Sequence, residues 1–166
     1  MRAGIAFGSN LGDRLQMLRQ ARACLLASAH LAPPVLTSRI YETSPVDCPP
    51  GSGPFLNAVI EAELTGDPGD LLADLRACEL GLGRPAHAKR NAPRAIDLDL
   101  LYAGDCELRT DGLILPHPRM TMRRFVLAPL ADIRPGLMLP GHTETIRQLL
   151  AKLPPGDSAV PIEVEW

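Results

Sequence analysis

The segment that most restricts the fold is a short run in which acidic and apolar residues alternate. It reads Ile-Asp-Leu-Asp-Leu, and alternation with a period of two is typical of a strand with one buried face. The pattern places Asp97 and Asp99 on one face, with their Cα atoms roughly 6.6 Å apart. Ile96, Leu98 and Leu100 then lie on the other face. A chain with this segment needs a sheet that is covered on one side and leaves room for two carboxylates on the other.

Two carboxylates at this spacing repel each other unless a cation lies between them. Just upstream, residues 84–94 form a basic segment that contains no acid, and Pro85 and Pro93 predict a loop there rather than a helix. Carboxylate oxygens are typical Mg²⁺ ligands, and guanidinium groups bind phosphate through paired hydrogen bonds. The combination favours Mg²⁺ with a polyphosphate, although an isolated Asp-x-Asp is more often a solvated strand face. The basic residues are Arg84, Lys89, Arg90 and Arg94.

The overall composition narrows the possible partners. A length of 166 residues fits one domain, spanning residues 1–166. The net charge of −2 creates no general field for nucleic acid or membranes, and an aromatic content of 4% argues against a base-stacking surface. The cysteines are widely spaced, and neither a signal peptide nor a membrane-spanning run is apparent. We expect a cytoplasmic protein that acts on small molecules, with no nucleic acid or membrane partner, and nothing demands more than a monomer.

Apolar periodicity predicts six elements in the order strand, helix, strand, strand, helix, strand. Pro33 and Pro34 are expected to end the first helix, and Asp67 to cap the second. Residues 43–54 contain four prolines and two glycines and predict a long loop, a kind of segment that often carries function. The predicted ranges are 4–8, 13–31, 35–41, 55–64, 68–80 and 96–102.

This order is the split βαβ arrangement of ferredoxin-like folds. Beyond it, the sequence predicts a turn around His117, helices at 124–131 and 144–153, and a small edge strand in the tail. We therefore expect an α+β protein with a ferredoxin-like βαββαβ core and additional helices.

Five segments, in this order, give the chain a family resemblance. The sequence resembles the 6-hydroxymethyl-7,8-dihydropterin pyrophosphokinases of folate biosynthesis, which implies transfer of a pyrophosphoryl group from ATP to the pterin hydroxymethyl oxygen, with release of AMP. It also implies two Mg²⁺ ions and a three-layer αβα fold. The segments are AFGSNLGD (6–13), YETSPV (41–46), PFLNAVIEAEL (54–64), LGRPAHAKRNAPRAIDLDLL (82–101) and LPHPRMTMRRFVLAPLADI (115–133).

The resemblance also implies roles for individual residues. Asp97 and Asp99 match the metal ligands, while Arg84, Arg90 and Arg94 match the basic residues of the catalytic loop. An amide can both donate to and accept from a pterin edge, and an aromatic ring can stack on it. The implied ATP-binding residues are Glu79, Arg94, His117 and Arg123, and the implied pterin-binding residues are Thr43, Ser44, Pro45, Val46, Phe55, Asn57, Asp97 and Phe125.

Some positions depart from the family pattern, and other functions compete with this interpretation. Polymerase-palm-like nucleotidyltransferases also carry paired aspartates on a ferredoxin-like sheet, but the low net charge argues against a template surface. A ferredoxin-like RNA-binding module would need exposed aromatics, and the chain has three Phe and two Tyr. The absence of GxxxxGK[ST] excludes a P-loop kinase. The departures, which put substrate affinities and loop dynamics in doubt, are Ala86, Asn91, Ala92, Gly112 and Ile114.

Overall fold

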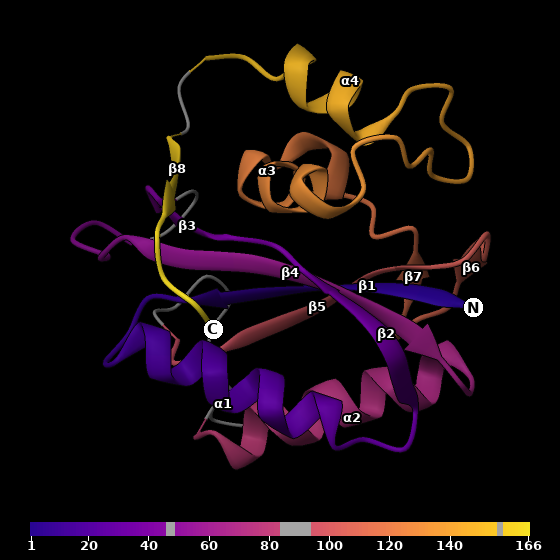
Figure 1. The fold of residues 1–166 in the computed structure, drawn as a ribbon, viewed down its shortest axis with the longest axis horizontal. Helices are drawn as coiled ribbons and strands as arrows, with labels where there is room; N and C mark the ends of the chain where they lie inside the picture. The colour runs from indigo at the N-terminus through magenta and orange to yellow at the C-terminus, as the bar shows by residue number, and fades with distance from the viewer. Residues whose placement is uncertain (46–48, 84–93, 156–157) are drawn as a thin grey trace.

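The computed structural model describes residues 1–45, 49–83, 94–155 and 158–166. Figure 1 shows a central sheet with α1 and α2 on one face and α3 and α4 on the other. In chain order the elements are β1 (Arg2–Ser9), α1 (Arg14–Leu26), β2 (Leu31–Thr37), β3 (Ile40–Thr43), β4 (Phe55–Leu64), α2 (Pro68–Gly81), β5 (Asp97–Ala103), β6 (Leu108–Arg109), β7 (Ile114–Leu115), the 3₁₀ helix η1 (Met120–Met122), α3 (Arg124–Ile133), α4 (Ile146–Lys152) and β8 (Ala159–Ile162).

The main sheet is antiparallel and has the strand order β5-β1-β4-β3-β8, with β2 also paired to β4. The predicted strand 35–41 is divided into β2 and β3. At the break, the Ser38 hydroxyl accepts from the Val59 N–H at 2.9 Å, and the Ser38 N–H donates to the Val59 carbonyl. With that division, the predicted strand and helix order is present, and the antiparallel sheet with its helices confirms the α+β class.

The first helix is shorter than predicted. It ends at Leu26 instead of continuing to residue 31. Ser28 donates its hydroxyl hydrogen to Asp74 and accepts a hydrogen bond from the His30 N–H. Side-chain bonds of this kind offer the backbone an alternative to the helix, and the partner on α2 could not be read from local sequence.

Pro33 and Pro34 do not end a helix but lie inside β2, so that prediction was wrong. Proline cannot donate to a ladder and is tolerated on edge strands and at bulges. Within the described ranges β2 pairs only with β4, and its register shifts between Ala32 and Leu36, around the two prolines. The strand at 55–64 and the Asp67 cap of α2 are confirmed, as is the small edge strand near the C-terminus, which is β8.

Two hydrophobic cores cover the two faces of the sheet. The core under α1 and α2 includes Leu98 and Leu100, and the core under α3 and α4 includes Leu101 and Tyr102. Leu101 takes the second face by ordinary alternation. Tyr102 takes the same face because of a register shift at Leu101, since Leu100 pairs with Ile5 whereas Tyr102 pairs with its neighbour, Gly4. The bulge therefore separates the alternating half of β5 from a half that is buried throughout.

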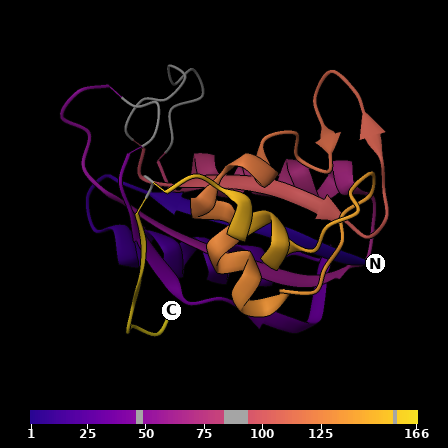
Figure 2. The same ribbon diagram turned by 90° about the horizontal axis from the view of Figure 1, so that it is seen from above.

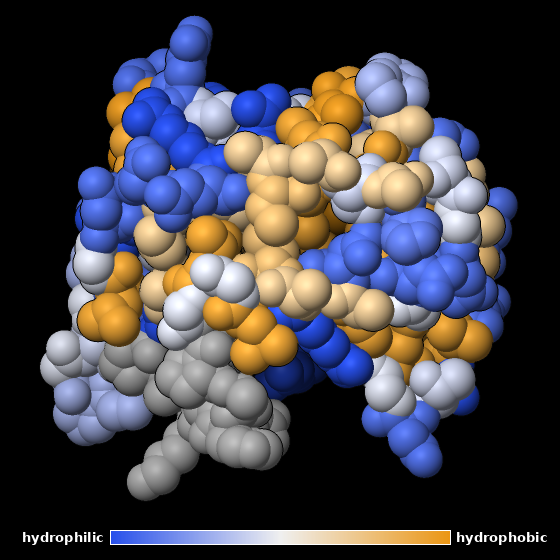
Figure 3. Space-filling model, turned by 90° about the horizontal axis from the view of Figure 1, so that it is seen from below, coloured by the Kyte–Doolittle hydropathy of each residue, from blue (hydrophilic) through white to orange (hydrophobic). Residues whose placement is uncertain are grey.

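The two outer faces of the molecule are shown in Figures 2 and 3. Figure 2 shows α3 and α4 side by side over the sheet, with the β6–β7 hairpin projecting at one side. Figure 3 shows the face of α1 and α2, where hydrophilic residues flank a central band of weakly hydrophobic ones. Among the described residues, no helix combines the length and apolar character needed to cross a membrane.

Candidate functional site

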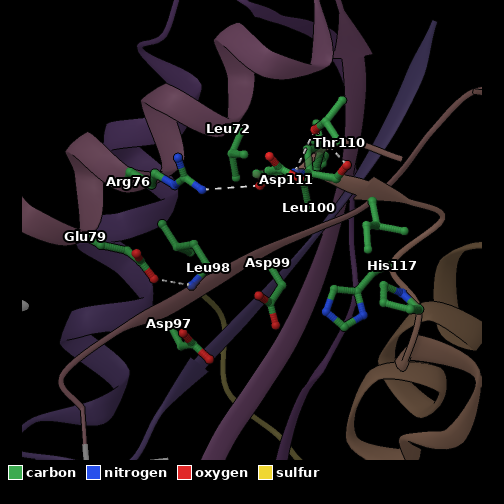
Figure 4. A pocket seen from close by; sticks show the side chains of 14 residues that line it. Leu72, Arg76, Glu79, Asp97, Leu98, Asp99, Leu100, Thr110, Asp111 and His117 are labelled. Carbon is green, nitrogen blue, oxygen red and sulfur yellow. Dashed lines mark hydrogen bonds between the residues drawn. The ribbon is translucent and has the colours of Figure 1, made fainter. Parts of the chain in front are cut away.

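The alternation predicted for residues 96–100 is present in the structure. Leu98 and Leu100 are buried, and Asp97 and Asp99 project from the opposite face of β5 (Figure 4). An arginine stands beside each acid: Arg94 Nη1 lies 2.7 Å from Asp97 Oδ1, and Arg123 Nη1 lies 3.8 Å from Asp99 Oδ2. The acidic side chains remain 29% and 38% exposed, respectively, so both carboxylates are accessible to a ligand.

The carboxylate pair has an unfavourable electrostatic environment for two negative charges. Burial raises the pKa of Asp99 above its ordinary value, and the neighbouring Asp97 raises it further. His117, Arg123 and Arg94 lower the same pKa without cancelling the rise. A divalent cation would relieve this repulsion, and Mg²⁺ is commonly held by one or two carboxylates together with substrate phosphates. The donor set therefore fits Mg²⁺ bound to a polyphosphate.

A cavity of about 370 Å³ opens beside these acids, between α2 and the segment 110–118 (Figure 4). Glu79 Oε1 accepts from the Leu98 N–H at 2.8 Å, which satisfies a backbone donor on the free edge of β5. Arg76 Nη2 donates to the Gly112 carbonyl at 3.3 Å and links the two walls. The lining residues are Leu72, Arg76, Glu79, Asp97, Leu98, Asp99, Leu100, Thr110, Asp111, Gly112, Leu113, Ile114, His117 and Pro118.

His117 is held at the cavity wall by two backbone contacts. Its N–H donates to the Leu101 carbonyl at 2.7 Å, at the β5 bulge. Its Nδ1 accepts from the Arg119 N–H at 3.2 Å. Burial lowers the pKa of the imidazole, and the nearby Asp99 only partly offsets that effect. A neutral ring whose Nδ1 is an acceptor carries its proton on Nε2, so His117 can offer one hydrogen-bond donor.

Gly8 brings the predicted pterin side next to the predicted metal side. Gly8 pairs with Asn57 on β4 and with Asp97 on β5. A Cβ at Gly8 would lie 3.1 Å from Asn57 Oδ1, and 3.9 Å from both the Asp97 Cβ and the Phe55 ring. The Asn57 amide is fixed from behind, because Nδ2 donates to Thr43 Oγ1 at 2.6 Å. Because glycine has no side chain, Gly8 leaves a small open surface between the Asn57 amide, the Phe55 ring and the Asp97 side chain.

Of the remaining predicted residues, Phe125 lies near the acid pair, Ser44 and Pro45 lie on the exposed surface, and others fall outside the described residues. Arg123 lies over the Phe125 ring, 5.3 Å from its centroid, which connects Phe125 to the Asp99 side of the site. Ser44 shares a hydrogen bond with Ser158, and Pro45 is exposed. The predictions for Val46, Arg84 and Arg90 fall outside the described residues, as do Lys89 and the departures Ala86, Asn91 and Ala92.

Sequence reasoning missed several contributors to the site. Arg76 lies in the cavity one helical turn before Glu79, so the i,i+3 spacing on α2 could have revealed it. Leu72 extends the same face of α2. Thr110 and Asp111 come from the turn after β6, and no local pattern pointed to them.

The fold and the site together define a class, an α+β protein with a carboxylate pair beside an arginine-containing cavity that suits a metal-bound polyphosphate. A sequence profile described as 7,8-dihydro-6-hydroxymethylpterin-pyrophosphokinase (HPPK) matches residues 4–135. The chain therefore belongs to the HPPK family.

Relatives matched over most of their length agree with this assignment. A 2-amino-4-hydroxy-6-hydroxymethyldihydropteridine pyrophosphokinase of Bacillus subtilis is 44% identical over 131 residues, covering 79% of this chain and 77% of that protein. The enzyme of the same name from Methylorubrum extorquens is 38% identical over 154 residues, covering 93% and 94%.

Solved structures match the fold at lower identity. The wild-type HPPK-DHPS of Plasmodium falciparum with pteroate has a TM-score of 0.70 and 17% identity, and the match covers 91% of this chain and 42% of that chain. An HPPK-DHPS in complex with substrates has a TM-score of 0.67 at 16% identity. This chain spans less than half the length of these two-part proteins, and at such identities the likeness concerns the fold alone.

Proposed function

We propose that this protein transfers a pyrophosphoryl group from ATP to the hydroxymethyl group of 6-hydroxymethyl-7,8-dihydropterin, giving AMP and the pterin diphosphate in folate biosynthesis. Membership of the family supports the reaction. The observation that carries it in the structure is the position of the acid pair. Asp97 and Asp99 both line the cavity at the edge of β5, and Asp97 also pairs with Gly8, across which lies Asn57. Asp97 thus lies next to both candidate substrate subsites, which supports the proposal.

On the nucleotide side, we assign Asp97 and Asp99 as ligands of two Mg²⁺ ions that would arrive with ATP. Such ions neutralise charge on the phosphates during transfer. Arg94 and Arg123 stand beside these acids and can bind phosphate oxygens as charge develops. His117 offers a neutral donor from Nε2, and Glu79 shapes the cavity through its bond to the β5 edge. Arg84 and Arg90 complete the proposed basic set.

On the pterin side, Asn57 is the proposed reader of the ring edge. Its Nδ2 is engaged by Thr43, which fixes the orientation of the amide and turns Oδ1 toward Gly8. An oriented carbonyl oxygen selects ring N–H groups. Phe55 and Phe125 are half-buried and are the proposed stacking surfaces. Ser44, Pro45 and Val46 are proposed to line the same pocket through the loop that follows β3.

The proposal extends to the form of the protein. Residues 1–166 are proposed to form one ferredoxin-like, three-layer αβα domain, supported by the strand order and by the helices on both faces of the sheet (Figure 1). We further propose that it acts as a cytoplasmic monomer on ATP and the reduced pterin, without nucleic acid or membrane partners.

The test is product identity. The protein is incubated with ATP, Mg²⁺ and 6-hydroxymethyl-7,8-dihydropterin, and nucleotide products are separated by chromatography. AMP should form in step with the pterin diphosphate, and it should not form when 6-methyl-7,8-dihydropterin, which lacks the acceptor hydroxyl, replaces the substrate. Formation of ADP in place of AMP would show that a single phosphoryl group moves and would refute the proposal. Omitting Mg²⁺ in the presence of a chelator should stop turnover.

A further inference from the structure

Asn10 follows the last residue of β1 and joins the end of that strand to the segment that leads into β5. The Asn10 N–H donates to the Arg94 carbonyl at 3.2 Å, and the Arg94 N–H donates to Asn10 Oδ1 at 2.9 Å. One residue therefore satisfies both backbone groups of Arg94. Asn10 is 8% exposed, and its bond to the Arg94 N–H is partly shielded from water.

The two bonds have a consequence for the orientation of the Arg94 side chain. Arg94 stands three residues before Asp97 and contacts its carboxylate at 2.7 Å. Asp97 in turn pairs with Gly8 on β1, two residues before Asn10. The end of β1 therefore contacts the start of β5 twice, through the pairing of Gly8 with Asp97 and through the hydrogen bonds of Asn10 with Arg94. The backbone from which the Arg94 guanidinium extends is therefore held close to Asp97.

The rest of the Asn10 side chain indicates that its acceptor, and not its donor, is the group that matters at this position. Its Nδ2 is buried and has no hydrogen-bond partner within the described ranges of the chain. A buried donor without a partner is destabilising, and structures usually avoid it. An apolar residue of similar size would avoid that cost. What it could not supply is the acceptor that faces the Arg94 N–H.

We propose that Asn10 is a positioning residue for pyrophosphoryl transfer, acting through Arg94. Its Oδ1 and its N–H hold the Arg94 backbone so that the guanidinium meets Asp97 and the incoming phosphates in a single geometry. The inference rests on the proposed function of Arg94 and Asp97. Misplacement of a group by about 1 Å can cost about 100-fold in rate, so an effect of that order is expected from a residue that itself touches no substrate.

The first experiment compares three variants in steady-state assays of AMP formation. Asn10→Ala removes the acceptor and should lower kcat about 10- to 100-fold, with a smaller change in KM for ATP and pterin because Arg94 is proposed to bind phosphate oxygens mainly as charge develops during transfer. Asn10→Asp retains an acceptor for the Arg94 N–H and should fall between wild type and Asn10→Ala. Ser9→Ala is the matched control, since Ser9 is an adjacent buried side chain whose Oγ also has no partner in the described residues. It should keep wild-type rates.

The second experiment separates positioning from general loosening of the fold. Asn10→Ala is combined with Arg94→Ala, and single-turnover rates and thermal midpoints are measured for both singles and the double variant. If Asn10 acts through the Arg94 guanidinium, Asn10→Ala should have no further effect on the rate once that group is gone, while still lowering the midpoint. An equal rate loss in both backgrounds would overturn the inference.

Two other results also decide against it. A rise in KM with kcat unchanged would make Asn10 a substrate ligand instead of a positioning residue, and wild-type rates for Asn10→Ala would show no role. Should Asn10→Ala fail to fold, Asn10→Asp and Asn10→Ser carry the same comparison. The proposed function is tested separately, because a wild-type protein that forms no AMP refutes that function whatever the Asn10 variants do.

Discussion

Gly8→Ala is a direct test of how the two halves of the site are brought together. The new Cβ would lie 3.1 Å from Asn57 Oδ1, closer than an ordinary van der Waals contact. The Asn57 side chain has little room to move away, because its Nδ2 donates a hydrogen bond to Thr43 Oγ1 at 2.6 Å and the residue is buried. The amide must therefore shift by a few tenths of an ångström or lose its bond to Thr43.

The size of the effect follows from that geometry. Adding a methyl group to a packed site lowers the free energy of unfolding by about 1–3 kcal/mol, and the lower part of that range applies because only one contact is short. Displacing Asn57 Oδ1 should also weaken its proposed hydrogen bond to the pterin by about 1–2 kcal/mol, which corresponds to about a 5- to 30-fold weaker Kd. ATP binding should change much less, since the contacts of the new Cβ with Asp97 Cβ and the Phe55 ring are ordinary ones at 3.9 Å.

Isothermal titration calorimetry measures both affinities, using the pterin in the presence of a non-hydrolysable ATP analogue. Gly136→Ala is the matched control, because a Cβ at Gly136 would meet no atom of the described residues within 4 Å beyond its chain neighbours, and its φ is not positive. A folded Gly8→Ala protein that binds pterin with wild-type affinity would refute the argument that the open surface at Gly8 is part of the pterin site.

Three further predictions concern single side chains. Asp97→Asn should lower AMP formation about 100- to 1,000-fold with little change in thermal midpoint, because it removes a proposed metal ligand from a partly exposed position; a near-normal rate would reassign that role. Glu79→Ala should lower the free energy of unfolding by about 1–3 kcal/mol in urea titrations, since the Leu98 N–H loses its acceptor, whereas Glu79→Gln should retain most of it. Burial would raise the pKa of Glu61, but hydrogen bonds from Arg134, from the Tyr102 hydroxyl and from Arg2 outweigh it and hold the pKa below its ordinary 4.5. The stability that Glu61 contributes should therefore be present above pH 4.5 and be lost as pH falls through the lowered value, and Glu61→Gln should flatten this part of a stability–pH curve; an unchanged slope would contradict the assignment.

Much of the fold could be predicted because the relevant signals are local. The alternation around Asp97 and Asp99 is a property of five consecutive residues, and it placed both acids on the exposed face of β5. Asp67 caps α2 through its own side chain, which accepts from the Gly69 N–H. The range 55–64 was predicted without error, because a largely apolar run there lies between a proline- and glycine-rich loop and the Gly66-Asp67 turn.

Other features depended on partners that local sequence does not name. The end of α1 is set by bonds that involve Asp74 on α2, and Pro33 and Pro34 are tolerated because β2 happens to lie at an edge of the sheet. The bulge at Leu101 reverses the face of β5 and places its carbonyl where His117 binds it. None of these could be read from periodicity.

The sequence by itself therefore determined the acid pair, the order of the main strands and helices apart from the division of β2 from β3, and the family. Only the tertiary structure decided how the site is assembled. Strand pairing brings Asn57 and Asp97 to either side of Gly8, and the end of β1 supplies Asn10 to hold Arg94. The physical reason is that an alternating pattern specifies which face a side chain takes, whereas its distance to another strand depends on register, and register is a property of the whole sheet.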